Sequence, residues 1–331
     1  MLYHGGCSTI ESRRLIPFGK FSYVISLPKA WVKKNRLGKG SDIYLKEEQD
    51  SLILSLSHEP SKKELKEVII SVDDKTIPTL KTEIISAYIN NYNLITVKSD
   101  QKDFDAERIK EIFHSLIAME VVEQDKNKIV AKDFLNYDDA SVSNLLRRID
   151  NITRSMITDS LDCIDHDNSE TVVHRDFDVN RLFYLSQRVI KTALNDPSLA
   201  KSFKLSNSDL TDTWFVIMSL EKIADAAKRI ARMLQTPDLS KKERELIRVD
   251  YKRIQQNFLD VMKAFHTLNF DSAFEVLNEN RKEMHRIKNL SEHSTSTAFV
   301  EIVEKIKVVQ TYVKRISQII INKEKGESHG I

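Results

Sequence analysis

The sequence predicts a multidomain α+β protein with an N-terminal β domain, a small ferredoxin-like α/β middle domain and a C-terminal all-α region of tandem three-helix bundles. Three changes of pattern along the 331 residues support this division. Short apolar runs broken by turn residues come first, strand-like and helix-like stretches then alternate, and apolar residues finally recur at three- and four-residue steps. We place the domains at residues 1–58, 62–136 and 139–322, followed by a flexible tail at 323–331.

The N-terminal domain is predicted from the segment FSYVISLPKAWVKKNRLGKGSDIYL at residues 21–45. From Phe21 to Leu27 large apolar residues alternate with Ser or Val, which is the period of a strand with one buried face. Pro28 suits the first turn of a helix, where its missing N–H costs nothing, and Gly38 is expected to cap that helix. The segment is therefore predicted to form a strand, a short helix, a turn and a second strand.

This segment lies in a strongly basic part of a nearly neutral chain. The net charge is only +2, but residues 12–41 contain eight Lys or Arg residues and no Asp or Glu. Such a local excess of positive charge usually has an anionic partner.

The strand, the SLPK sequence, the short helix and the GKG turn resemble the AbrB/SpoVT family of swapped-hairpin DNA-binding domains. The resemblance covers roughly residues 9–57, with Ser41 standing between the Gly and the Asp of the family's turn. It implies a homodimer of interlaced hairpins that binds DNA, because one hairpin of this size cannot close a core alone. Trp31, next to Pro28, is expected to anchor the dimer core and not to stack on bases.

The candidate DNA contacts are the cations that could neutralise phosphates and release their counterions. They are Arg13, Arg14, Lys20, Lys29, Lys33 and Lys34. The resemblance favours Arg13, Arg14 and Lys29 for groove and phosphate contacts, whereas Lys33 and Lys34 could equally form a solvated helix face.

The middle domain is predicted from strand and helix patterns in the order β-α-β-α-β-β between residues 62 and 136. This order suggests a small α/β sandwich of ferredoxin-like type. Glu111 and His114 form an isolated E-x-x-H pattern, which we interpret as part of a solvated helix face because a metal site in a bundle would need a second copy.

The C-terminal region is predicted to contain an internal repeat, with three helices in residues 139–236 and three in 243–322. DVNRL, from Asp178 to Leu182, parallels EMHRI, from Glu283 to Ile287. AKRIA and VKRIS likewise stand at matching positions in the third helix of each set. Two tandem three-helix bundles follow from these matches.

Two segments of this region, RDFDVNRLFYL and SLEKIADAAKRIA, resemble the PhoU family of phosphate-uptake regulators. Asp176 and Asp178 match the family's second-helix pattern, with Asn180 in place of an expected acid, while Glu221 and Asp225 match its E-x-x-x-D pattern. A basic hairpin followed by an α/β segment and such a bundle resembles the archaeal regulators of phosphate uptake.

The resemblance implies one carboxylate cluster for a divalent or ferric metal ion, made by Glu221, Asp225, Asp176 and Asp178, with Fe, Mg, Mn and Zn as candidates. Carboxylates four residues apart on a helix repel each other by about 0.2–0.5 kcal/mol, so a positive charge is expected beside them. That charge could also be a side chain, because Lys222, Lys228 and Arg229 lie on the same helix. The spacing is compatible with a metal ion and with a cationic side chain beside the carboxylates.

The second repeat favours no more than one intact metal site. Aligning the third helices places Lys307 and Thr311 at the positions of Glu221 and Asp225. A lysine there would repel a cation, although Glu283 and His285 remain as candidate ligands on the preceding helix.

The chain is expected to be cytoplasmic and not an integral membrane protein. Two cysteines, Cys7 and Cys163, fit neither a disulfide framework nor a zinc ligand set, and no apolar run is long enough to cross a bilayer. Catalysis is not expected, because paired E-x-x-H motifs, Ser-His-Asp or Cys-His signatures and a Gly-rich phosphate loop are all missing from the sequence.

The function predicted from these features is a DNA-binding transcriptional regulator of phosphate uptake. Its helical region would sense phosphate status through a metal ion or through a phosphate transporter or histidine kinase partner. The alternative is an adaptor that does not bind DNA and instead docks on a phosphate transporter and down-regulates it.

Overall fold

The computed structural model describes residues 12–48, 51–56, 65–100, 105–290 and 296–323. The chain divides into two compact units, residues 1–64 and 65–331, which are described separately. Cys7 and residues 324–331 of the predicted tail lie outside the described residues.

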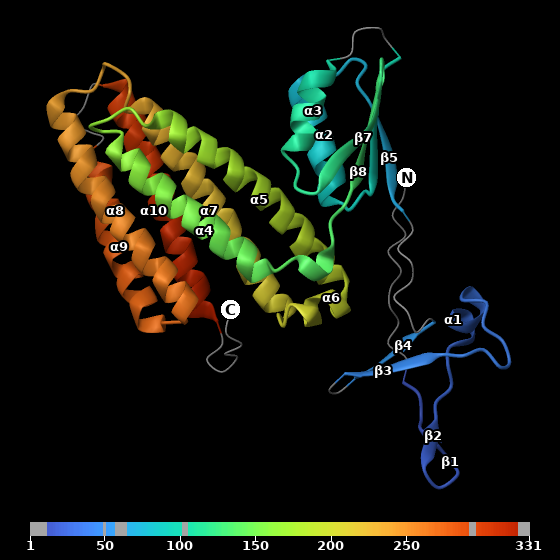
Figure 1. The fold of residues 1–331 in the computed structure, drawn as a ribbon. Helices are drawn as coiled ribbons and strands as arrows, with labels where there is room; N and C mark the ends of the chain where they lie inside the picture. Colours follow the sequence, from blue (N-terminus) through green and yellow to red (C-terminus); the bar gives the residue numbers. More distant parts are fainter. Residues whose placement is uncertain (1–11, 49–50, 57–64, 101–104, 291–295, 324–331) are drawn as a thin grey trace. The chain divides into compact units, whose positions relative to one another are not determined.

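The first unit consists of two antiparallel hairpins with a short helix between them (Figure 1). Strands β1 (Ile16–Phe18) and β2 (Ser22–Val24) pair across a turn in which Gly19 has a φ of 71°. Helix α1 (Lys29–Lys34) follows, and β3 (Tyr44–Glu48) then pairs with β4 (Ser51–Ser55). The predicted order of strand, helix and strand is confirmed.

Helix α1 is shorter than predicted, because it ends at Lys34 and Gly38 does not cap it. Arg36 adopts a left-handed φ of 53°, and its N–H donates to the Lys33 carbonyl while the Leu37 N–H donates to the Val32 carbonyl. These two bonds form the Schellman motif that closes many helices, with an arginine where glycine is usual.

The predicted buried face of the first unit is exposed in the single chain. Phe21 is 98% and Tyr23 68% exposed, and no residue in the described part of this unit is buried. Strands of three residues offer no second layer against which an apolar face could pack, so burial of this face needs another surface.

The second unit begins with a four-stranded sheet covered on one face by two helices, which Figure 1 shows on a single side of the sheet. Its elements are β5 (Glu67–Ser71), α2 (Ile77–Ile89), β6 (Leu94–Lys98), α3 (Ala106–His114), β7 (Met119–Asp125) and β8 (Lys128–Asp133). Alternate apolar residues of the strands pack against the two helices around the fully buried Leu80, Tyr88 and Phe113. The expected small sheet domain is confirmed.

The strand order differs from that of a ferredoxin-like sheet. Strands lie in the order β5-β6-β8-β7, with β5 parallel to β6 and the other neighbours antiparallel. A ferredoxin-like unit runs β-α-β-β-α-β, whereas this chain places both helices before the final hairpin. The short turn at residues 126–127 forces β7 and β8 to pair, and β8 then completes the sheet beside β6.

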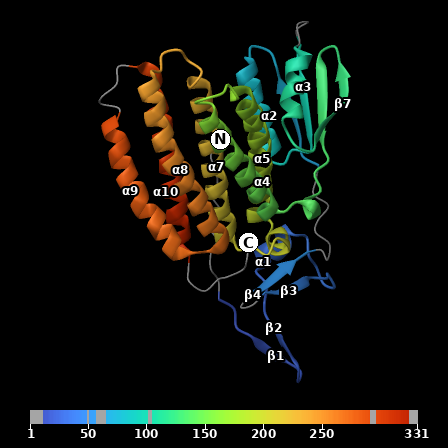
Figure 2. The ribbon, with the colours of Figure 1, turned by 60° about the vertical axis from the view of Figure 1, so that its left-hand side comes forward.

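The remainder of the second unit is a helical bundle whose long helices lie side by side in both views (Figures 1 and 2). It comprises a single 3₁₀ turn η1 (Tyr137–Asp139) and α4 (Val142–Asp162), α5 (Ser169–Asn195), α6 (Pro197–Ser202), α7 (Asn207–Met233), α8 (Lys241–Thr267), α9 (Phe270–Leu290) and α10 (Thr297–Asn322). The six predicted helices correspond to α4, α5, α7, α8, α9 and α10, and the short α6 was not predicted. Tandem helical bundles are confirmed.

Serine caps set the starts of several helices in the bundle. Ser206 and Asp209 form a reciprocal capping box at α7, and Ser240 and Glu243 do so at α8. One continuous apolar core extends from Val142 of α4 to Ile320 of α10, so the two repeats share their interior. Among the described residues, no helix combines the length and the apolarity that crossing a bilayer requires.

Candidate functional site

The six candidate DNA-contacting residues of the first unit are all exposed. Arg13 and Arg14 precede β1, and Lys20 lies in the turn between β1 and β2. Lys29 begins α1, and Lys33 and Lys34 form its last turn. The side chains of these residues are therefore accessible to solvent. Trp31 is half-buried, as is Pro28.

The predicted carboxylate cluster is only partly assembled, between α5 and α7. Asp176 of α5 is 8% exposed and faces Asp225 of α7 through a shared partner, Lys228. The Lys228 Nζ lies 2.8 Å from Asp176 Oδ2 and 2.9 Å from Asp225 Oδ1. Glu221, one turn before Asp225, is half-buried, whereas Asp178 is exposed because it lies on another face of α5.

Further cations surround this cluster. Arg229 Nε donates to Asp225 Oδ2 at 2.9 Å, and Asn180 Nδ2 donates to Asp176 Oδ2 at 3.0 Å. Glu221 Oε2 lies 3.2 Å from Lys222 Nζ. Asn180, which stands where the family pattern expects an acid, thus donates a hydrogen bond to Asp176.

The pKa values of the cluster follow from burial and these partners. Burial acts to raise the pKa of Asp225, but the hydrogen bond and the charge of Lys228, together with Arg229, hold that pKa below its ordinary value. Burial acts to lower the pKa of Lys228, yet its bonds to Asp176 and Asp225 raise that pKa overall. Burial raises the pKa of Glu221, and the attraction of Lys222 offsets this only in part.

These residues do not fit a metal ion as they stand. A metal ligand set would need several carboxylate oxygens that converge on one cation, but an ammonium group already lies between Asp176 and Asp225. Across the part of the chain that the structure describes, no group of three or more His, Cys, Asp or Glu residues is arranged to hold a metal.

The carboxylates of the second repeat are also paired with cationic side chains, between α8 and α9 and within α10. Arg286 Nη2 pairs with Asp250 of α8 and lies 2.9 Å from Glu283 Oε2. Arg253 Nη1 approaches Glu283 Oε1 at 3.7 Å. Lys307, at the position of Glu221, pairs with Glu304 at 2.6 Å.

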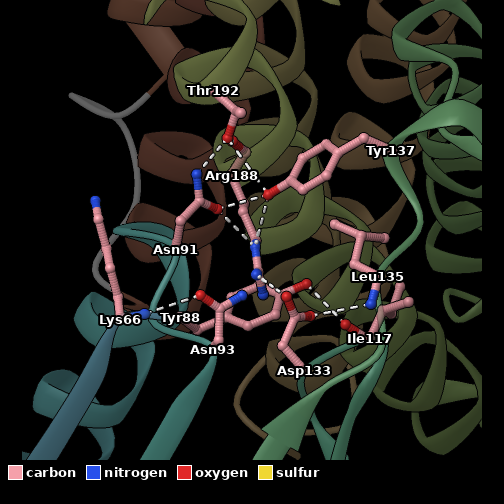
Figure 3. A network of polar contacts seen from close by, with 10 residues as sticks. All are labelled: Lys66, Tyr88, Asn91, Asn93, Ile117, Asp133, Leu135, Tyr137, Arg188 and Thr192. Atoms are coloured by element: carbon pink, nitrogen blue, oxygen red, sulfur yellow. Dashed lines mark hydrogen bonds and ion pairs between the residues drawn. The ribbon is translucent and has the colours of Figure 1, made fainter. Parts of the chain in front are cut away.

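A buried polar network joins the sheet domain to the bundle, and the sequence did not reveal it (Figure 3). Its centre is Arg188 of α5, whose Nη2 donates to Asp133 Oδ2 at 2.5 Å; the Arg188 residue is fully buried. The Arg188 Nε donates to Asn91 Oδ1 at 2.9 Å and to Tyr137 Oη at 3.1 Å. The guanidinium also lies 4.6 Å from the centre of the Tyr88 ring.

The rest of the network fixes these partners. Asn91 Nδ2 donates to Thr192 Oγ1 at 2.5 Å, and Tyr137 Oη donates to Asn91 Oδ1 at 2.6 Å. Thr192 Oγ1 in turn donates to the Arg188 carbonyl at 2.8 Å. Because Asn91 follows α2 and Thr192 belongs to α5, the contacts hold the sheet domain against the bundle.

The fold and its charges define a multidomain protein with a basic two-hairpin unit and a helical-bundle unit that carries its own sheet domain. Comparisons with known proteins agree with this class. Residues 146–234 match the family model of the PhoU domain, and residues 22–66 match that of "Antidote-toxin recognition MazE, bacterial antitoxin". The chain therefore carries a PhoU domain and, at its N-terminus, an antitoxin domain of MazE/AbrB type.

One solved structure that resembles this chain is the crystal structure of PhoU from Pseudomonas aeruginosa. It is 14% identical and has a TM-score of 0.46, with 54% of this chain and 93% of that chain covered. No curated protein matches this sequence.

Proposed function

We propose that the chain is a DNA-binding transcriptional regulator of phosphate uptake that acts in the cytoplasm. The observation that carries this proposal is the set of exposed cations in the first unit: eight Lys or Arg residues lie between residues 12 and 41, without one Asp or Glu among them. Arg13, Arg14, Lys20, Lys29, Lys33 and Lys34 are exposed and therefore accessible to the phosphates of a duplex.

A homodimer is part of the proposal, because the single unit leaves its apolar side chains in water. Ile16, Phe18, Phe21, Tyr23 and Ile25 are all more than half exposed. The register of β1 and β2 places Ile16 and Phe18 on one face of the hairpin and Tyr23 on the other, so apolar side chains are exposed on both faces, as in a hairpin that packs against a partner. A second copy of the same hairpin offers a matching surface, and the similarity to the MazE antitoxin domain supports this choice.

The phosphate part of the proposal rests on the PhoU domain. The matched residues, 146–234, cover α4 to α7, which contain the cluster around Lys228. The domain would act through protein contacts, with a phosphate transporter or a histidine kinase as the partner. Catalysis plays no part in this proposal.

The test is DNA binding by the full-length protein at several salt concentrations. Arg13→Gln/Arg14→Gln removes four cations from the proposed dimer and is expected to weaken binding and to reduce the slope of log K against log salt by up to about 3.6, since each lost phosphate contact changes it by about 0.9. Lys252→Gln/Lys263→Gln removes two exposed charges of α8 and is the matched control, expected to leave the slope unchanged.

Chromatin crosslinking and sequencing would then identify the sites bound in cells. Enrichment of promoters of phosphate-transport genes supports the proposal. A protein that binds no DNA at low salt, but is recovered with a phosphate transporter, would instead be the adaptor.

A further inference from the structure

The positive charge between α5 and α7 comes from a lysine side chain of the protein itself. Lys228 Nζ bridges Asp176 Oδ2 of α5 and Asp225 Oδ1 of α7, at 2.8 and 2.9 Å. We propose that Lys228 is a tethered cation that joins these helices in the place that the family resemblance assigns to a metal ion. The PhoU domain of this chain then assembles without metal. This inference stands whether or not the first unit binds DNA.

Oxygen atoms of Asp176 and Asp225, on which a metal would depend, already have cationic partners. Asp176 Oδ2 accepts from both Lys228 and Asn180, while Asp225 Oδ2 accepts from Arg229. An incoming cation would have to displace the Lys228 ammonium from two carboxylates at once, against its positive charge. Asp178 cannot compensate, since it is exposed on another face of α5.

The formal charges of the cluster also balance. Asp176, Glu221 and Asp225 are opposed by Lys222, Lys228 and Arg229, each of which lies in an ion pair with one of the three acids. Lys228 is the central member of this set because it contacts acids on two helices, whereas Lys222 and Arg229 pair with acids on their own helix.

The second repeat also contains a cationic side chain that pairs with acids of two helices, at a different position. There Arg286 of α9 pairs with Asp250 of α8 and with Glu283 of its own helix. A cationic side chain again links acids on two helices, although the residue and the helix pair are different. Protein cations thus neutralise acids between helices in both repeats.

The first experiment uses the wild-type full-length protein. Elemental analysis is expected to find no stoichiometric Mg, Mn, Fe or Zn, and thermal unfolding with EDTA or with millimolar Mg²⁺, Mn²⁺ or Zn²⁺ is expected to give an unchanged Tm. One tightly bound metal ion per chain, removed by EDTA with a fall in Tm and lost in Glu221→Gln, would overturn the proposal.

The second experiment removes the tethered charge. Lys228→Met is expected to lower the Tm by several degrees, because Asp176 and Asp225 then face each other across two helices without a bridging cation. Added Mn²⁺ or Mg²⁺ is expected to restore part of the loss, and Lys228→Met/Asp225→Asn is expected to lose this metal response. Lys228→Arg keeps the positive charge, and its Tm is expected not to change when metal is added.

The matched control is Arg229→Met, which removes an exposed partner of Asp225 on the same helix and is expected to change the Tm little. A Lys228→Met protein that is as stable as wild type would contradict the inference. If that variant does not fold, the metal titration of the wild-type protein decides the question by itself.

Discussion

Replacing Arg188 by Met tests whether the sheet domain and the bundle are held together by one buried ion pair. Arg188 and Asp133 have side chains only 1% and 5% exposed, and their atoms Nη2 and Oδ2 are 2.5 Å apart. Methionine is long and apolar enough to occupy much of the same space, so the substitution removes the charge and the hydrogen bonds with little change in volume.

The expected cost is about 3–5 kcal/mol of unfolding free energy, the usual range when one partner of a buried pair is deleted and the other charge stays buried. Loss of the contact with the Tyr88 ring adds to that cost by about 0.5–2 kcal/mol. Replacing both partners, as in Arg188→Met/Asp133→Leu, should cost less than Arg188→Met alone, because no unpaired charge remains.

Urea unfolding of the full-length protein, followed by circular dichroism, measures these differences through the midpoint and the slope. Lys191→Met is the control: Lys191 is exposed, lies on the same helix and donates to Asn90 Oδ1 at 2.6 Å. Its loss should cost less than about 1 kcal/mol. Two results would show that the ion pair does not hold the two parts together. One is a loss of unfolding free energy in Arg188→Met no larger than that in Lys191→Met. The other is a loss in Arg188→Met/Asp133→Leu equal to the sum of the losses in the two single variants.

Two further predictions concern the cluster and the first unit. Burial raises the pKa of Glu221, so its charged form destabilises the folded chain. The penalty is absent below the unfolded-state pKa of about 4.3, where the carboxyl group is protonated in both states, and it is complete once the pH exceeds the folded-state pKa. Glu221→Gln should therefore be more stable than wild type near pH ~7.5 and equal to it near pH ~4 in urea titrations, and a constant difference across this range would refute the assignment. In the first unit, Phe21→Asp is expected to convert a dimer to a monomer in sedimentation velocity, while Phe274→Asp, which changes an exposed phenylalanine of α9, should leave the mass unchanged. A monomeric wild-type protein, or a dimeric Phe21→Asp variant, would remove the dimer from the proposed function.

The bundle could be predicted from sequence because its apolar residues recur with the helical period over long stretches. Each predicted run corresponds to one observed long helix, and many of its apolar residues belong to the core that extends from Val142 to Ile320. The predicted runs began after the true helix starts, because the capping boxes of Ser206 with Asp209 and of Ser240 with Glu243 lie in polar segments outside the apolar repeat.

The partners of the buried charges could not be predicted, because each depends on a residue distant in sequence. Arg188 lies in the run LSQRVIKTAL, where its spacing is compatible with a solvated face, and it is buried only because Asp133, 55 residues earlier, lies opposite. Likewise Glu221 and Asp225 were consistent with a metal ion or with a lysine. Only the contact of Lys228 with Asp176, 52 residues earlier in the chain, favours the lysine.

The order of strands in the sheet was also beyond the sequence pattern. The succession β-α-β-α-β-β was predicted correctly, but several sheets share it, and the choice depends on which edge the final hairpin joins. The observed pairing of β8 with β6 buries Ile129 and Ala131 against the helices, a packing preference that local periodicity does not contain.

The charge distribution makes the DNA-binding test informative about the first unit in particular. Residues 12–41 contribute +8 to a net charge of +2, so the remaining residues together carry −6. The cations around Lys228 and Arg286 are paired with carboxylates of the same unit, so they are poor ligands for phosphate. Residues 1–64 as a whole carry +4 and residues 65–331 carry −2, so a steep dependence of DNA affinity on salt is expected to arise in the N-terminal hairpins.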